Sequence, residues 1–507
     1  MLPLAALSGP IPKAGVIVAA GLVAVALLHP RARVRAAAIL AALGLAPVLL
    51  LADIWHSPQL AIVHRHPLVA VAVAAVGLAV VAALARVVAR RPWLLALLAL
   101  LALPFRIPIA AGGATTYLLV PLYLVVGAGS LAFALPPLLA RDRCAERERV
   151  PLGAPAAWVQ RLLALYVLLY ALQSVYSPDF EKALQQMVFF YVPFGLLFCL
   201  LREVRWTPWL LRRCLVLVVA LAVVFAALGF VEYATKTLLL NPKLVAENQV
   251  HTYFTVNSVF FDPDIYGRFL ALVMISLAAA LLHARRAQEQ LTATLILAIL
   301  WAGLVLTLSR SSLAALLVGL GVLGAMRWRA WPILAAGALV VVIGLAALAV
   351  SPKTFGLNQG LNGASSGRAG LIGGGLRLFA REPVWGNGSG SFVERYRALH
   401  PGSTQTLAAS HTIAITIGAE QGIIGELPYL ALVVVAVVAL LRGARGDPAR
   451  AALAACFIAL VLHTQLYADF LEDPASWTLL VIGTALAASG RGEVRGSVVE
   501  PSAVAVA

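Results

Sequence analysis

Residues 67–91 read PLVAVAVAAVGLAVVAALARVVARR, an apolar run that ends in three arginines. A membrane-spanning helix needs roughly 20 apolar residues, because the hydrocarbon core of a bilayer is about 30 Å thick. Similar Ala, Leu and Val runs, separated by short arginine-rich gaps, recur along the whole chain. The pattern predicts an all-α polytopic membrane protein with roughly 12-15 transmembrane helices.

The composition agrees with this fold class. Of the 507 residues, 62% are hydrophobic and 12% are charged, whereas a soluble domain has about 25% charged residues. A large soluble domain is therefore excluded. The net charge of +16 does not indicate nucleic acid as a partner, because arginine clusters between apolar runs are typical of cytoplasmic loops. The four cysteines have no metal-ligand spacing and predict no disulfide framework.

The arginine clusters also predict how the chain is organised, with the C-terminus in the cytoplasm. Two outer segments are long. The longer one is glycine-rich and polar, carries several arginines and has a helical pattern over residues 371–380, which indicates one large extracytoplasmic loop subdomain. We expect five parts: an N-terminal transmembrane bundle (1–235), a transmembrane region (236–350) with an outer loop (236–264), a large outer loop (351–410), C-terminal transmembrane helices (411–490) and a cytoplasmic tail (491–507).

The first candidate for chemistry is His411, in Ser410-His411-Thr412. We expect Ser410 to cap a helix that carries His411 in its first turn. The positive end of the helix dipole would keep the imidazole neutral and able to accept a proton near pH 7. An interfacial histidine above an ordinary packing motif is the alternative, and the residues alone leave both open. On a continuous helix, three glycines would form a smooth packing stripe near the His411 face, and Glu420 would lie on the opposite face: Gly418, Gly422 and Gly425.

Two arginines on the predicted outer side are candidates for binding phosphate. Arg310 stands between two apolar runs, and Arg368 precedes an amphipathic run. A guanidinium suits phosphate because its planar fork donates two hydrogen bonds at once. A snorkelling arginine at a helix end is the alternative. Arg377 and Arg381 are expected to form a solvated face, and the glycine-rich turn in residues 382–392 could bring backbone amides close to a ligand.

Acidic side chains form the last candidate set. Asp262 and Asp264 are expected mainly as a turn and helix cap before the next span. A second group could bind sugar hydroxyls or balance the arginines: His463, Asp469, Glu472 and Asp473. Carboxylates scattered at loop ends are a weak indication of a metal, and no metal site is expected.

Together these residues resemble the O-antigen ligase and polymerase superfamily of bacterial membrane glycosyltransferases, from about residue 262 to residue 477. His411-Thr412, nine residues and Gly422-Ile423-Ile424-Gly425 match its histidine motif. Ser309-Arg310-Ser311 is similar to its arginine motif, and Arg368 upstream of Pro383-Val384-Trp385-Gly386-Asn387-Gly388 is similar to its third. The chain departs from the family at Thr412 and Asp264, where the family often has asparagine.

The resemblance implies transfer of a glycan from undecaprenyl diphosphate to an acceptor hydroxyl, on the periplasmic side of the bacterial inner membrane. It implies inversion at the anomeric carbon and no metal, nucleotide sugar or other cofactor. His411 would be the general base, and Arg310 and Arg368 would bind the diphosphate. The implied partners are the lipid-linked glycan donor, a lipid or glycolipid acceptor and membrane lipids. Four further residues are candidate substrate contacts: Asp262, Asp264, Thr412 and Asp469.

Three activities compete. An O-antigen ligase of lipopolysaccharide biosynthesis, with lipid A core or an equivalent as acceptor, is favoured over a polysaccharide polymerase, whose acceptor is another lipid-linked repeat unit. A membrane transporter is the alternative from another class. A transporter predicts internal repeats and charges at the bilayer midplane, whereas the sequence has no convincing repeat and its candidate charges fall at the ends of spans.

Overall fold

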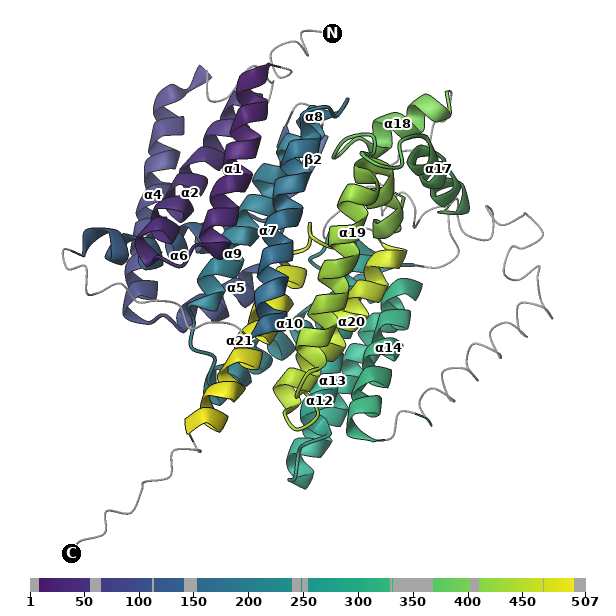
Figure 1. The fold of residues 1–507 in the computed structure, drawn as a ribbon. Coiled ribbons are helices and arrows are strands. Elements are labelled where there is room, and N and C mark those ends of the chain that lie inside the picture. Colours follow the sequence, from purple (N-terminus) through teal and green to yellow (C-terminus); the bar gives the residue numbers. More distant parts are fainter. Residues whose placement is uncertain are drawn as a thin grey trace, which may run out of the picture.

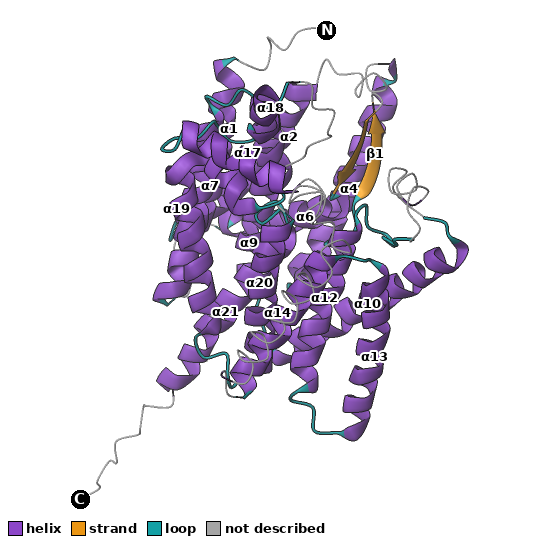
Figure 2. Cartoon of the chain, turned by 90° about the vertical axis from the view of Figure 1, so that its right-hand side faces the viewer, coloured by secondary structure: helices purple, strands orange, loops and turns teal. Residues whose placement is uncertain are grey.

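The computed structural model describes residues 9–54, 65–111, 114–140, 153–238, 248, 254–328, 331, 368–401, 410–467 and 469–496. Twelve helices within these residues are long and apolar enough to cross a membrane, which confirms the all-α polytopic fold. The described part of the chain also holds one antiparallel hairpin, β1 (Ile107–Ala111) with β2 (Ala114–Leu118) (Figure 2).

The N-terminal half forms one group of helices around an apolar core of aliphatic and aromatic side chains, to which residues near the C-terminus also contribute. Helix α1 packs against α2 and α7, and α6 packs against α2 and α4. The helices are α1 (Pro10–Leu28), α2 (Ala32–Ile54), α4 (Pro67–Arg90), α5 (Leu94–Ala102), α6 (Val120–Leu139) and α7 (Ala154–Ser174). The next span, Phe180–Arg202, consists of α8 (Phe180–Gln186), the π-helical turn η3 (Met187–Tyr191) and α9 (Val192–Arg202).

The C-terminal half contributes a second core, in which α12, α14 and α20 pack together. Its helices are α10 (Pro208–Thr235), α12 (Pro263–Leu281), α13 (Ala287–Leu306), α14 (Arg310–Arg327), α19 (Ile413–Leu441), α20 (Pro448–Leu466) and α21 (Pro474–Gly496). Helix α19 packs against α7 and so joins the two halves.

The described part of the long outer loop forms two short helices, α17 (Arg368–Arg381) and α18 (Phe392–Leu399). Helix α17 contains the helical pattern predicted over residues 371–380. Both helices lie at one end of the bundle, opposite the end of α21 (Figure 1). Residues 351–367 and 402–409 of this loop lie outside the described residues, as do residues 239–247 and 249–253 of the smaller outer loop and residues 497–507 of the tail.

Candidate functional site

Four helix ends meet close to His411. Asp262 caps α12, its carboxylate accepting a hydrogen bond from the backbone N–H of Asp264 at 2.7 Å. Ser309 caps α14 by accepting from the N–H of Ser312 at 3.2 Å. Tyr467 follows α20, and its ring centroid lies 6.2 Å from that of His411. These polar capping residues each stand at the end of a span. Where the ends of separate spans meet, their polar side chains lie close together.

His411 itself precedes α19. The predicted position in the first helical turn is wrong, because Thr412 is the N-cap and the helix begins at Ile413. Ser410 Oγ accepts from the N–H of Thr412 at 3.2 Å, and Thr412 Oγ1 donates to the carbonyl of Gln465 at 3.0 Å. These hydrogen bonds hold the residues on both sides of His411 in place. His411 lies between them with φ 61°, a left-handed conformation that is uncommon for any residue other than glycine.

The charges around His411 favour the neutral imidazole. Burial lowers its pKa below the ordinary 6.5, and the nearby Arg368 guanidinium lowers it further, against an opposing contribution from Asp264. The neutral state agrees with the prediction from the sequence. Its cause is different, because burial and a neighbouring cation dominate rather than the helix dipole.

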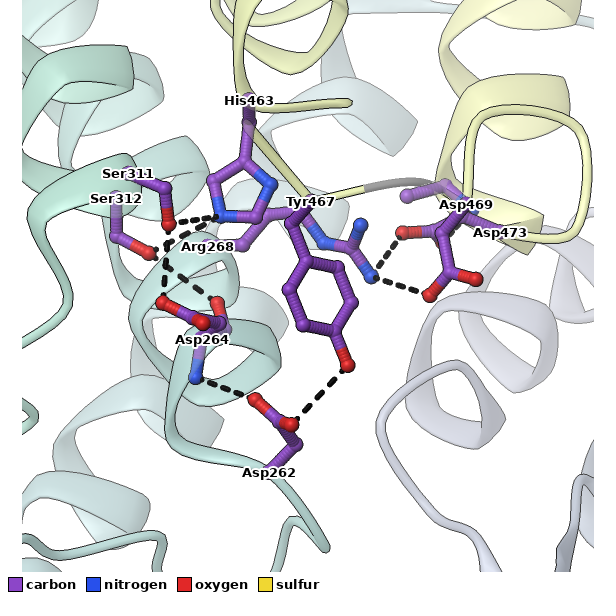
Figure 3. Close-up of polar contacts among 10 residues, drawn as sticks. Asp262, Asp264, Arg268, Ser311, Ser312, His463, Tyr467, Asp469 and Asp473 are labelled. Carbon is purple, nitrogen blue, oxygen red and sulfur yellow. Dashed lines mark hydrogen bonds and ion pairs between the residues drawn. The ribbon is translucent and has the colours of Figure 1, made fainter. Parts of the chain in front are cut away.

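A hydrogen-bond network connects α12, α14 and α20 (Figure 3). The Asp264 carboxylate accepts from Ser309 and, at 3.0 Å, from Ser311. The Oγ atoms of Ser311 and Ser312 lie 3.2 Å and 3.3 Å from Nε2 of His463, which is fully buried. The serines of the predicted arginine motif therefore hold α14 against α12 and α20.

Asp262 connects the network to Tyr467. Its carboxylate accepts a hydrogen bond from the Tyr467 hydroxyl at 3.1 Å (Figure 3). Burial, together with the neighbouring charge of Asp264, raises the pKa of Asp262 to about 6. The role of Asp262 and Asp264 in capping α12 agrees with the sequence prediction.

Sequence reasoning missed Arg268, the central charge of the network. Its guanidinium is buried and pairs with Asp473 at 2.6 Å and Asp469 at 3.9 Å (Figure 3). Its Nη1 has no hydrogen-bond partner among the described residues. An arginine inside an otherwise apolar span, four residues after Asp264, is itself a functional signal. Asp469, expected as a candidate substrate contact, is thus a partner of this arginine.

The two phosphate-binding candidates differ in their surroundings. Arg368 is the first residue of α17, close enough to His411 to lower its pKa. Arg310 is the first residue of α14 and is exposed. No hydrogen bond or ion pair connects the Arg310 side chain to another described residue, so its guanidinium is available to a ligand.

The predicted continuous glycine stripe on α19 is wrong. Gly422 has φ 62° and ψ −163°, which breaks the helix. The outer turn, the glycine-rich residues 382–391 between α17 and α18, packs into the break. The N–H groups of Ile423 and Ile424 donate to the carbonyls of Pro383 and Val384, and the N–H groups of Asn387 and Gly388 donate to the carbonyls of Ala419 and Glu420. Backbone groups freed at a break inside a span need such partners.

The buried side chain of Glu420 also holds the outer turn. Its carboxylate accepts from the backbone N–H of Gly390 at 2.8 Å and from that of Phe392 at 3.1 Å. The turn amides that were expected to approach a ligand therefore bind a side chain of the same protein. As expected, Glu420 is not among the groups around His411. No group of three His, Cys, Asp or Glu side chains within the described residues could hold a metal ion.

Comparison with known proteins finds a family that part of this chain resembles. The O-antigen ligase family model matches residues 294–430, a segment that contains Arg310, Arg368, His411 and the broken helix. No curated protein matches the chain. The family match confirms the predicted resemblance to the O-antigen ligase superfamily and supports a multi-pass membrane glycosyltransferase that acts on a lipid-linked glycan.

Proposed function

We propose that the protein transfers a glycan from undecaprenyl diphosphate to an acceptor hydroxyl on the periplasmic face of the bacterial inner membrane, as an O-antigen ligase. One observation carries the proposal. Within the segment that matches the family, a half-buried histidine with a lowered pKa lies close to one arginine and one carboxylate, Arg368 and Asp264.

In the proposed reaction His411 acts as general base. The neutral imidazole takes the proton of the acceptor hydroxyl while the acceptor oxygen forms a bond to the anomeric carbon. The bond from that carbon to the diphosphate oxygen breaks, and undecaprenyl diphosphate leaves with the electron pair. Attack from the face opposite the leaving group inverts the anomeric carbon. General base catalysis of this kind contributes about 10²–10⁴-fold.

Arg310 and Arg368 are proposed to bind the diphosphate and to stabilise the charge that develops on it. Both are arginines at the first residue of a helix, where unpaired backbone N–H groups add positive potential. Thr412, Asp262 and Asp264 lie near enough to be contacted by the substrate. No metal is invoked in this mechanism.

The distribution of arginine supports an outward-facing site. Helices α12, α14 and α19 begin at the site and α20 ends there, so their other ends lie at the opposite side of the bundle. Arginines gather at those other ends: Arg285, Arg286, Arg327, Arg442, Arg445 and Arg450. Such clusters favour the cytoplasmic side.

Reconstituted transfer tests the proposal. Purified protein in liposomes receives an undecaprenyl-diphosphate glycan and either lipid A core or a second lipid-linked repeat unit, with and without a chelator. We expect His411→Ala to lose about 10²–10⁴-fold in rate and His400→Ala to keep wild-type activity, since His400 ends α18 away from this site. Undiminished transfer by His411→Ala would contradict the base assignment, and loss with chelator would establish a metal requirement. Transfer to the repeat unit alone would make the protein a polymerase.

The diphosphate assignment has its own test. We expect Arg310→Lys to reduce kcat/KM, because a lysine ammonium is a point charge that does not reproduce the planar fork of arginine. Arg327→Lys, at the other end of the same helix, is the matched control. A fully active Arg310→Lys variant would remove Arg310 from the mechanism.

A further inference from the structure

A second concave site lies apart from His411. A cavity of about 720 Å³ opens between the end of α7, the C-terminal part of α17, the outer turn and α18. This volume is within the range of small-molecule sites, about 300–1,000 Å³. None of His411, Arg310 and Arg368 lines it. Beside apolar residues, its lining includes aromatic, charged and polar side chains: Tyr176, Arg381, Glu382, Trp385, Asn387 and Arg395.

The aromatic ring of Trp385 is exposed on a fixed backbone. Its side chain is 61% exposed, yet its carbonyl accepts hydrogen bonds from the Tyr176 hydroxyl at 2.5 Å and from Gln173 Nε2 at 3.1 Å. The next residue, Gly386, lies against the main chain of Glu420 and Gln421. Because the backbone of Trp385 is already held, a ligand need not order the turn before it contacts the ring.

Within the described residues, the cavity's two arginines make no ion pair. Both Arg381 and Arg395 are exposed. With Glu382, the lining carries a formal charge of about +1, from two arginines and one carboxylate. An interfacial tryptophan that only anchors the protein in lipid does not require two free guanidinium groups beside it.

We propose that this cavity binds sugar units of the glycan at a distance from the reacting carbon, and that it prefers acidic sugars. The faces of Trp385 and Tyr176 fit the apolar C–H faces of pyranose rings, as amphipathic aromatic side chains do in polar sites. Arg381 and Arg395 fit a sugar carboxylate or phosphate, which accepts two hydrogen bonds from one guanidinium.

The geometry of α17 connects the two sites. Arg368 begins this 14-residue helix near His411, and Arg381 ends it at the cavity. The helix is about 20 Å long, so the cavity would hold sugars several units away from the bond that is formed. Binding energy from such remote units can be used at the reacting centre. This role in transfer rests on the proposed function, whereas binding of a saccharide does not.

Binding is tested first, on the purified full-length protein by calorimetry, with trigalacturonate as the acidic probe and maltotriose as the neutral one. We expect tighter binding of trigalacturonate, a roughly tenfold weakening of both by Trp385→Ala, and a weakening of trigalacturonate alone by Arg381→Gln with Arg395→Gln. Tenfold corresponds to about 1.4 kcal/mol. Controls are Trp328→Ala, equally exposed at the other end of α14, and Arg377→Gln on α17.

Absence of binding for both probes, or equal weakening by the control variants, would overturn the proposal. Transfer assays then vary glycan length, on the donor in one arm and on the acceptor in the other. We expect the loss of kcat/KM in Trp385→Ala to grow about tenfold with glycan length in one of these arms.

The two proposals fail in different ways. Saccharide binding that depends on Trp385, without any transfer, would leave the cavity assignment intact and contradict the proposed function. Transfer that is impaired equally in Trp385→Ala for short and long glycans in both arms would overturn the cavity assignment and leave the function intact.

Discussion

Replacing Gly422 by alanine should separate the outer turn from α19. At φ 62° and ψ −163°, Gly422 has a backbone conformation that is essentially restricted to glycine. A Cβ at this position would lie 2.5 Å from the carbonyl oxygen of Val384 and 2.7 Å from the N atom of Gly386. Both are backbone atoms, so no flexible side chain can move aside.

The expected cost follows from these contacts. The strained conformation costs about 1–3 kcal/mol. Displacing the turn breaks the bonds from Ile423 N–H to Pro383 and from Ile424 N–H to Val384, each worth about 0.5–1.5 kcal/mol. The loss is about 2–6 kcal/mol, so the amides of Ile423 and Ile424 should exchange with solvent at least roughly 25-fold faster.

Hydrogen exchange measured by mass spectrometry on the intact protein reports these two amides directly. Gly44→Ala in α2 is the control, because a Cβ there meets nothing within 4 Å and alanine is the better helix former. We expect that variant to exchange like the wild type at residues 423 and 424. A Gly422→Ala protein within about threefold of the wild-type rate, less than 1 kcal/mol, would refute the proposed docking of the turn.

Two further substitutions test the buried charges. Glu420→Gln should weaken the turn by about 1–3 kcal/mol, because an amide offers one oxygen to the two N–H groups that the carboxylate accepts; faster exchange at Gly390 and Phe392 is the measurement. Glu426→Gln on the same helix is its control. Equal exchange in both variants would contradict a role of the Glu420 carboxylate in holding the turn. Arg268→Gln should lower the melting temperature by several degrees, since an unpaired buried charge costs about 3–5 kcal/mol. Arg286→Gln removes an exposed ion pair worth about 0–1 kcal/mol, and a similar change in both would contradict the buried network.

The spans could be predicted because their signal is local. A run of about 20 apolar residues has few alternatives to a membrane helix, and most described runs form one. Helix α17 was also predictable, since its apolar positions recur with helical spacing. The motif residues around His411 come together because each stands at the end of a predicted span.

The helix break at Gly422, the ion pairs of Arg268 and the fixed backbone of Trp385 depend on contacts between distant segments, which the sequence does not display. The spacing of Gly418, Gly422 and Gly425 suits a continuous helix as well as a broken one, and only the partner turn near Pro383 decides between them. Arg268 lies inside an apolar run, where its partners Asp469 and Asp473 are some 200 residues away in sequence. The fixed backbone of Trp385 likewise depends on α7, and its neighbours alone do not indicate it.

The pH dependence of kcat/KM tests the role of His411 most directly, because loss of activity in His411→Ala could also follow from its unusual backbone. The charged and titratable groups near the ring are Arg368, Asp264 and Tyr467. Asp262 and His463 are in contact with Tyr467. A base must be neutral, so activity should fall as the pH drops through the lowered pKa of His411, with a midpoint below 6.5. Asp262, with a pKa of about 6, titrates in the same window, and Asp262→Asn removes its contribution.

We predict that the acid limb persists in Asp262→Asn. In that background Arg368→Gln should move it to higher pH, because a cation that disfavours imidazolium is gone. Asp264→Asn should move it to lower pH, because an anion that favours imidazolium is gone. If the acid limb is absent in Asp262→Asn, or if neither Arg368→Gln nor Asp264→Asn shifts it, the assignment of His411 as the base is contradicted.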